Sequence, residues 1–114
     1  MLYNLSMVEL MGDNDPAFIK TLLGLFIESI PPDLEALNQA WAEKDWDKVA
    51  FVVHKMKPTI DSLGVDTLKP TILALEAKGS KDKLSLSVIA GHIEQINAAL
   101  QQVILDMKAD FPDL

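Results

Sequence analysis

Apolar residues recur every three or four positions through most of this chain, which is the period of a helix with one buried face. The most regular run comprises Trp46, Val49, Val53, Met56, Ile60 and Leu63. A second run near the C-terminus comprises Ile89, Ile93, Ile96, Leu100, Val103 and Met107. Sustained alternation of apolar and polar residues, which would predict strands, does not occur in the sequence. We therefore expect an all-α protein.

The segment that follows residue 15 has the same periodicity, although two prolines interrupt it. Its recurring apolar residues are Phe18, Leu22, Leu25, Phe26, Ile30, Leu34, Leu37 and Trp41. Asp15 followed by Pro16 is typical of a helix start, where an Asx side chain caps and proline takes the first position. Pro31 and Pro32 remove backbone donors from the interior, which favours a kink or a break. Because the period continues in phase across them, we expect one kinked helix.

Turn and cap signals divide the remainder of the chain. Residues 2–11 predict a short helix that ends at Gly12, and Asp45 is a cap for the helix that follows it. Gly64 predicts the end of that helix, and a shorter helical segment then leads to Gly79. Together with the two longer runs, these segments predict an antiparallel four-helix bundle with a short additional N-terminal helix.

Composition limits the class of protein and of partner. A length of 114 residues predicts a single domain over residues 1–114, and the absence of cysteine excludes disulfides, a thiol nucleophile and a cysteine zinc site. The net charge of −7 argues against nucleic acid and anionic membranes and favours a protein partner, although solubility alone also explains it. Neither a signal peptide nor an apolar run of about 18 residues is visible, so we expect a cytoplasmic protein without a membrane span.

His54 is the first candidate for chemistry. At about 100° per residue, Val53 faces the core and His54 lies one step round the helix, at the edge of its apolar face. Lys57 follows one turn later on the same side. An imidazole is a nucleophile near neutral pH, and a nearby ammonium can neutralise the oxygens of a transferred phosphoryl group. The pair therefore predicts a site that holds a phosphoryl group.

A lone histidine at a helix edge is more often an ordinary surface side chain, so the prediction depends on its neighbours. Glu76 lies at the edge of the next helical segment, and a hairpin through Gly64 would bring its carboxylate to the ring and fix the tautomer. Ala50 and Gly64 are small and leave room along the same stripe. Phe51, one turn before His54, offers apolar surface for docking a protein.

The run from His54 to Gly64, His-Lys-Met-Lys-Pro-Thr-Ile-Asp-Ser-Leu-Gly, resembles the motif of histidine phosphotransfer (Hpt) domains. That motif is His-x-Leu-Lys-Gly-Ser/Ala-Ser/Ala-x-x-Leu-Gly, and the histidine, the lysine, the apolar residue between them and the final Leu-Gly all match. The start of the helix, Lys44-Asp45-Trp46, and the downstream pair Leu75-Glu76 are also similar to the family. The resemblance covers about residues 17–78.

The resemblance implies a role for each matching residue. His54 is similar to the phosphoacceptor, Lys57 to the lysine that supports the phosphoryl charge, Glu76 to the residue that orients the imidazole, and Gly64 to the terminal glycine of the motif. The residues expected to dock a partner are Phe51, Ala50, Lys55 and Pro58. Pro58 departs from the glycine that the family often has there. Because proline cannot donate to the carbonyl of His54, we expect a kink near this turn.

The function implied is that of a phosphorelay intermediate. His54 would accept a phosphoryl group from a phospho-aspartyl receiver domain and pass it reversibly to another receiver. The expected partners are receiver domains of response regulators and a sensor (hybrid) histidine kinase, and the expected carrier is a monomer. We expect no cofactor and no metal site of its own, with magnesium supplied by the partner receiver.

Because the chain contains no Gly-rich phosphate loop or kinase motif, we expect no independent kinase or hydrolase activity.

Two other functions compete with the interpretation as a phosphorelay intermediate. The first alternative is a non-catalytic helical adaptor that binds a partner protein through the face of His54 and Phe51. The second, a metal-binding bundle enzyme, is disfavoured because the chain has no Glu-x-x-His pair.

Overall fold

The computed structural model describes residues 3–76, 85–112 and 114. Its elements in chain order are α1 (Ser6–Met11), α2 (Pro16–Ala42), α3 (Trp46–Ser62), the short 3₁₀ helix η1 (Asp66–Leu68), α4 (Lys69–Glu76) and α6 (Leu86–Asp110). No strand occurs in this described part of the chain, so the predicted all-α class is confirmed there. The predicted end of the third helical segment at Gly79 lies outside the described residues.

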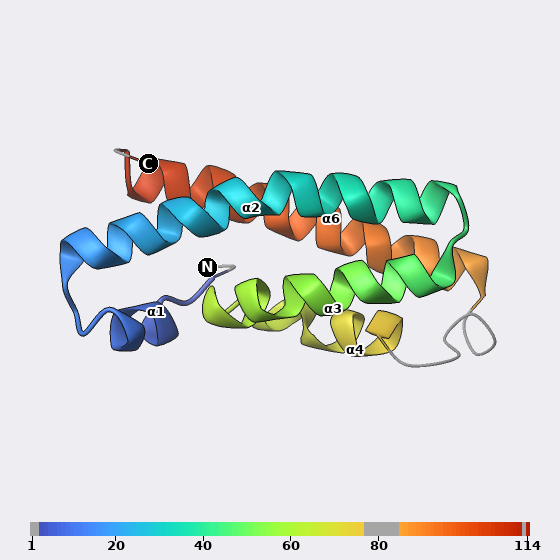
Figure 1. The fold of residues 1–114 in the computed structure, drawn as a ribbon, viewed down its shortest axis with the longest axis horizontal. Coiled ribbons are helices and arrows are strands. Elements are labelled where there is room, and N and C mark those ends of the chain that lie inside the picture. The colour runs from blue at the N-terminus through green and yellow to red at the C-terminus, as the bar shows by residue number, and fades with distance from the viewer. Residues whose placement is uncertain (1–2, 77–84, 113) are drawn as a thin grey trace.

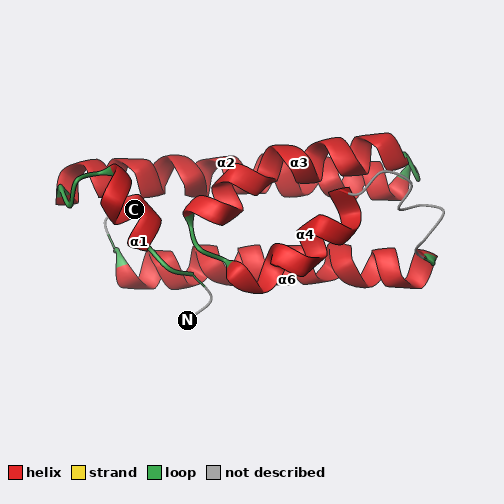
Figure 2. Ribbon diagram, turned by 90° about the horizontal axis from the view of Figure 1, so that it is seen from below, coloured by secondary structure: helices red, strands yellow, loops and turns green. Residues whose placement is uncertain are grey.

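The helices pack along one another around a shared apolar core. In Figure 1 the two longest helices, α2 and α6, run alongside each other, and α3 follows the C-terminal half of α2. Figure 2 shows the same molecule from below, with α4 lying between α3 and α6. The short helix α1 contacts α2 at the far end. This arrangement brings one edge of α3 against α4, and that edge carries His54.

Helix α3 forms as its sequence predicts. The carboxylate of Asp45 accepts a hydrogen bond of 3.2 Å from the backbone N–H of Lys48, which caps the helix. Five residues of the expected apolar stripe are buried, and Trp46 at its start is partly buried. Asp47 lies in the first turn, where its negative charge interacts favourably with the helix dipole and stabilises the helix. The stripe fixes which side of α3 faces the core and leaves His54 at its edge.

Gly64 follows the C-terminal end of α3 and adopts a backbone conformation that other residues rarely adopt. Its φ is +64°, and the N–H groups of Gly64 and Val65 donate to the carbonyls of Asp61 and Ile60, each at 3.1 Å. These two bonds form a Schellman motif, which satisfies carbonyls at the helix end and reverses the chain. The predicted stop is confirmed, and the reversal leads directly into η1 and α4.

Pro58 does not end α3, because the helix continues through it to Ser62. The carbonyl of His54 nevertheless has no N–H at position 58 to accept, since proline has none. The bend that we expect near this turn stays a prediction. The side chain of Pro58 lies on the exposed face of α3.

Helix α2 is a single element that contains both Pro31 and Pro32, as predicted. Figure 1 shows its axis changing direction between its two halves. Asp15 caps it by accepting from the N–H of Ala17 at 3.0 Å. The prediction of which apolar residues face the core in its N-terminal half was wrong, however. The buried residues there are Leu23 and Ile27, whereas Phe18 and Leu25 are exposed.

The physical reason is that two apolar stripes run side by side in this half of α2. One contains Leu22 and Phe26, which are partly buried, and the other contains Leu23 and Ile27, which reach the core. The second stripe continues through Ile30 and the following turns at alternating spacings of four and three residues. Periodicity alone cannot choose between neighbouring stripes, because packing decides which one faces the core.

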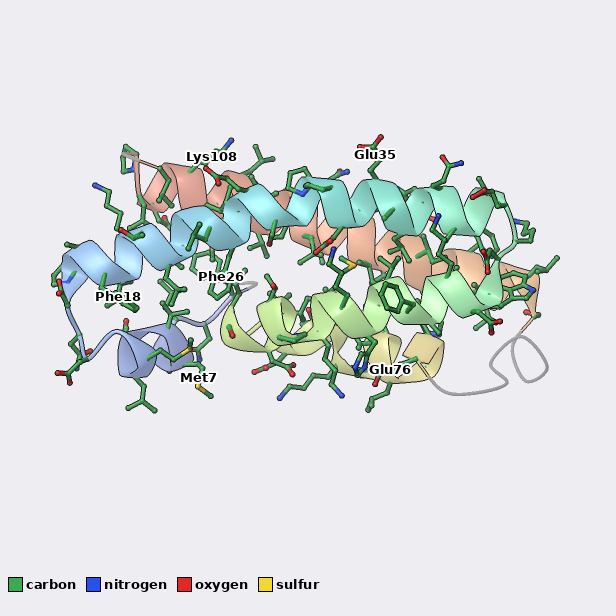
Figure 3. The ribbon with its side chains drawn as sticks, viewed as in Figure 1. Met7, Phe18, Phe26, Glu35, Glu76 and Lys108 are labelled. Carbon is green, nitrogen blue, oxygen red and sulfur yellow. The ribbon has the colours of Figure 1, made fainter. Side chains whose placement is uncertain are left out.

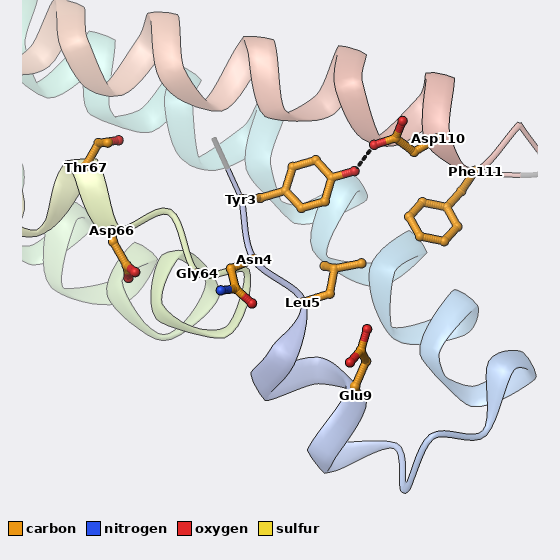
Figure 4. Close-up of a pocket in the computed structure, with 9 residues that line it drawn as sticks. All are labelled: Tyr3, Asn4, Leu5, Glu9, Gly64, Asp66, Thr67, Asp110 and Phe111. Atoms are coloured by element: carbon orange, nitrogen blue, oxygen red, sulfur yellow. Dashed lines mark hydrogen bonds between the residues drawn. The ribbon is translucent and has the colours of Figure 1, made fainter. Parts of the chain in front are cut away.

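The N-terminal segment ties the ends of two helices together. The N–H of Asn4 donates to the carbonyl of Leu63 at 2.8 Å. The buried side chain of Tyr3 donates a hydrogen bond from its hydroxyl to Asp110 at the end of α6 (Figure 4). The pKa of Tyr3 is raised to about 12, mainly by burial and to a smaller extent by the Asp110 carboxylate. The segment then enters α1, which begins at Ser6, later than predicted.

Candidate functional site

His54 and Glu76 meet across the contact between α3 and α4. The side chain of His54 is 72% exposed, and its Nδ1 lies 3.1 Å from Oε1 of Glu76. Figure 3 shows Glu76 reaching toward α3 from α4. A carboxylate accepts and cannot donate, so the favourable tautomer carries its proton on Nδ1. In that tautomer, Nε2 keeps a free lone pair, which is the requirement for a nucleophile.

The second carboxylate oxygen of Glu76 faces a cation. Oε2 is buried and has no hydrogen-bond partner among the residues that the structure describes, and Nζ of Lys57 lies 3.7 Å from it. This separation is too long for a hydrogen bond but is within the range of an ion pair. Glu76 therefore lies between the imidazole and the ammonium group, and one carboxylate acts on both.

Lys57 is partly exposed and is not hydrogen-bonded to Glu76. Lysine is a compact charge on a flexible stem, so its ammonium can move from a carboxylate to phosphoryl oxygens near the ring. A nucleophile of fixed tautomer with a movable cation one turn away is a chemical set that can accept and hold a phosphoryl group.

The predicted docking residues surround the histidine but differ in their environments. Phe51 is 68% exposed and Pro58 is also exposed, whereas Ala50 is partly buried. Lys55 is engaged: its Nζ lies 3.2 Å from Oδ1 of Asp33 on α2. The face around His54 therefore presents an aromatic ring and a proline, with one lysine tied to a neighbouring helix.

Asp33 is a site residue that the sequence reasoning missed. It is buried on α2, and its charge is compensated by Lys55, the residue next to His54. A signal was present, because Asp33 lies beside Leu34 and one turn after Ile30, on the apolar face of the helix. A carboxylate on a buried face needs a partner, so this position predicts an ion pair with a facing helix.

Gly64 lies ten residues after His54, at the end of α3, and its surroundings differ from those of the histidine. A Cβ atom at this position would lie 2.5 Å from the carbonyl oxygen of Asn4 and 2.7 Å from its Cβ. The space that the glycine leaves is therefore taken by the N-terminal segment.

One comparison with known proteins identifies the family of the chain. The family model for the Hpt domain matches residues 21–106, which is well over half of the chain. The chain therefore belongs to the Hpt domain family, whose members transfer phosphoryl groups through histidine in phosphorelays and work with receiver domains. The resemblance seen in the sequence is thus confirmed. Neither the curated proteins nor the solved structures contain a significant match.

Two further findings concern what the described residues do not contain. Within residues 3–76 and 85–112, no helix is long and apolar enough to cross a membrane. In the same part of the chain, no group of three or more histidine, aspartate or glutamate side chains is placed to hold a metal ion.

Proposed function

We propose that His54 is the residue through which this Hpt domain carries phosphoryl groups. It accepts the group from the aspartyl phosphate of one receiver domain and passes it to the aspartate of another. The observation that carries the proposal is the 3.1 Å contact between Nδ1 of this exposed ring and Glu76. The contact favours the tautomer in which Nε2 is available, and the family of the chain supplies the reaction.

The transfer step requires few groups. The lone pair of Nε2 attacks phosphorus in line with the bond to the receiver's aspartate. That P–O bond breaks, and its electron pair stays on the aspartate as a carboxylate. The ring keeps its proton on Nδ1 and acquires a positive charge. The negative carboxylate of Glu76 stabilises that charge. The reverse step returns the lone pair to Nε2 as the phosphoryl group moves to the next aspartate.

Lys57 completes the proposed site by changing partners. In the resting state its ammonium lies near Oε2 of Glu76, at 3.7 Å, without a hydrogen bond. When phosphate is attached to His54, new oxygens lie within reach, and a charge-assisted hydrogen bond to them is stronger than the long ion pair. Phosphoryl transfer depends mainly on positioning and on neutralising charge, so this movement supports the reaction in both directions. Magnesium is supplied by the receiver.

The proposal extends to the finer architecture and the biological setting. Helices α2, α3, α4 and α6 form an antiparallel four-helix bundle, to which α1 is an additional short helix. The domain acts as a cytoplasmic monomer between a sensor (hybrid) histidine kinase and the receivers of response regulators. It has no kinase or hydrolase activity of its own, because its site is completed only by the partner.

The test is to mix the chain with a panel of phosphorylated receiver domains and to look for phosphate that is labile in acid and stable in base. We expect label on the wild type and none on His54→Gln. The matched control is His92→Gln, which removes the other histidine of the chain and should take as much label as the wild type. If no receiver labels the wild type, or if His54→Gln is labelled equally, the proposal fails. Receiver binding without label would support the adaptor alternative.

A further inference from the structure

Two large apolar side chains are exposed beside the reactive pair. Phe51 lies one helical turn before His54 on α3, and Leu73 lies one turn before Glu76 on α4. Their exposed fractions are 68% and 62%. Residues three apart on a helix share a face, so each apolar side chain lies on the same side as its reactive neighbour.

These two side chains lie at opposite ends of the pair. The chain reverses after α3, and Leu73 and Ile72 of α4 line the same hollow as Lys57 and Ile60 of α3. Leu73 is therefore level with the part of α3 that follows His54, whereas Phe51 precedes it. At 1.5 Å per residue, the two side chains are separated by roughly 10 Å along α3. His54 and Glu76 lie between them.

The hollow next to Leu73 is large enough for one side chain. Its volume is about 170 Å³, and its lining residues are Lys57, Ile60, Asp61, Lys69, Ile72 and Leu73. For comparison, a cavity of about 150 Å³ holds a benzene molecule. Three apolar side chains line it together with two lysines and an aspartate, and protein interfaces likewise combine apolar and polar groups. Nζ of Lys69 lies 3.4 Å from Oδ1 of Asp66, and both side chains are exposed.

The reaction itself requires a partner surface over this region. A receiver must bring its aspartyl phosphate within bonding distance of Nε2, so its surface covers His54. A standard interface buries about 800 Å² on each partner, which corresponds to a circle of about 16 Å radius. Phe51 and Leu73 each lie only one turn, about 5 Å, from the reactive pair. Both therefore fall well inside the area that a receiver covers.

We propose that Leu73 and the hollow beside it form a second anchor for the receiver, on α4, which takes one apolar side chain of the receiver. This proposal rests on the proposed function, because it assumes transfer at His54. Phe51 provides the first anchor on α3. Two anchors on either side of the ring fix the receiver in both position and rotation, so a receiver without a matching apolar side chain is disfavoured.

The experiment compares Leu73→Ser with Leu105→Ser. Leu105 lies on α6 and is equally exposed, at 62%, so its replacement controls for the loss of a surface leucine. For each variant, transfer from a phosphorylated receiver domain is measured at several receiver concentrations. Labelling by phosphoramidate, a small donor that needs no docking, is measured in parallel. We expect Leu73→Ser to raise the KM for the receiver about tenfold, as truncating an interface anchor does.

The other readouts should not change. The rate at saturating receiver, the labelling by phosphoramidate and all values for Leu105→Ser should match the wild type. If Leu73→Ser and Leu105→Ser have the same KM, the anchor is wrong although the proposed function stands. A lower rate with phosphoramidate would also contradict the anchor, because it would place Leu73 in the chemistry. If no receiver labels the wild type, the proposed function fails, and the anchor fails with it.

Discussion

Glu76 contacts His54 through only one of its two carboxylate oxygens. Oε1 lies 3.1 Å from Nδ1, whereas Oε2 is buried and faces the ammonium of Lys57 at 3.7 Å. An amide at this position could still accept the hydrogen bond of the ring, but it would carry no charge. The negative charge of Glu76 is therefore a separate property from its position, and the two can be tested separately.

Replacing Glu76 by glutamine should slow transfer about tenfold, because a hydrogen bond to a charged group is worth more than a neutral one. Glu76→Gln keeps an acceptor for Nδ1, whereas Glu76→Ala removes both the acceptor and the charge and should slow transfer further. Single-turnover rates with a phosphorylated receiver measure both effects. Equal rates for Glu76→Ala and the wild type would contradict the proposed role.

Replacing Lys57 by glutamine should also slow transfer about tenfold, since the phosphoryl oxygens lose a cation that neutralises them. The helical content should stay that of the wild type, because Lys57 lies at the edge of α3 and not in its core. The control is Lys48→Gln, which removes an exposed lysine from the first turns of the same helix. Rates and circular dichroism measured together separate the two effects. Unchanged rates for Lys57→Gln would count against its role.

Gly64→Ala should destabilise the fold by about 2 kcal/mol, because the positive φ and the contact with Asn4 both exclude a side chain. Gly91→Ala is the matched control, since a Cβ there has no atom within 4 Å and the position lies inside α6. It should stabilise the fold by about 0.5–1 kcal/mol. Urea unfolding measures both. If Gly64→Ala kept full stability but slowed transfer, the glycine would belong to the reaction site.

Alkaline titration should show that Tyr3 ionises late. It is the only tyrosine in the chain, so ultraviolet absorbance of the phenolate reports on it alone. Burial and the Asp110 carboxylate raise its pKa to about 12 in the folded state, against about 10 in the unfolded chain. The stability that neutral Tyr3 contributes is thus present below pH 10 and lost as the pH rises from about 10 to 12.

Asp110→Asn should lower the pKa of Tyr3 toward 10, because one of the charges that oppose the phenolate is removed. Circular dichroism during the titration distinguishes ionisation in the folded state from unfolding. A wild-type midpoint near pH 10 with the helical signal intact would show that Tyr3 is not buried against Asp110.

The sequence predicted the buried face best in those helices where one apolar stripe continues along the whole helix. In α3 and α6 one stripe at spacings of three and four runs along the helix, although Phe51 and Leu105 lie outside it and are exposed, and every predicted core residue of α6 is buried. In the first half of α2, two adjacent apolar stripes compete, and the one that reaches the core depends on how α1 and α6 pack against it. Local periodicity contains no information about that packing.

The candidate site followed the same division. His54 and Lys57 share a face through helix geometry, and one hairpin was enough to bring Glu76 near the ring. The pairing of Lys55 with Asp33 depends on how α3 docks on α2, and the passage of Asn4 over Gly64 joins segments that are distant along the chain. Such contacts depend on the docking of whole helices, and an isolated aspartate or asparagine does not indicate its partner.

The openness of His54 has a consequence for how signals are shared. Because the ring is largely exposed, every receiver that fits the surrounding face has access to it, and on the proposed function these receivers compete for the same phosphate. The share that each one obtains then follows from its abundance and its affinity. A change in the expression of one receiver would redistribute phosphate among all the others, without any alteration in this chain.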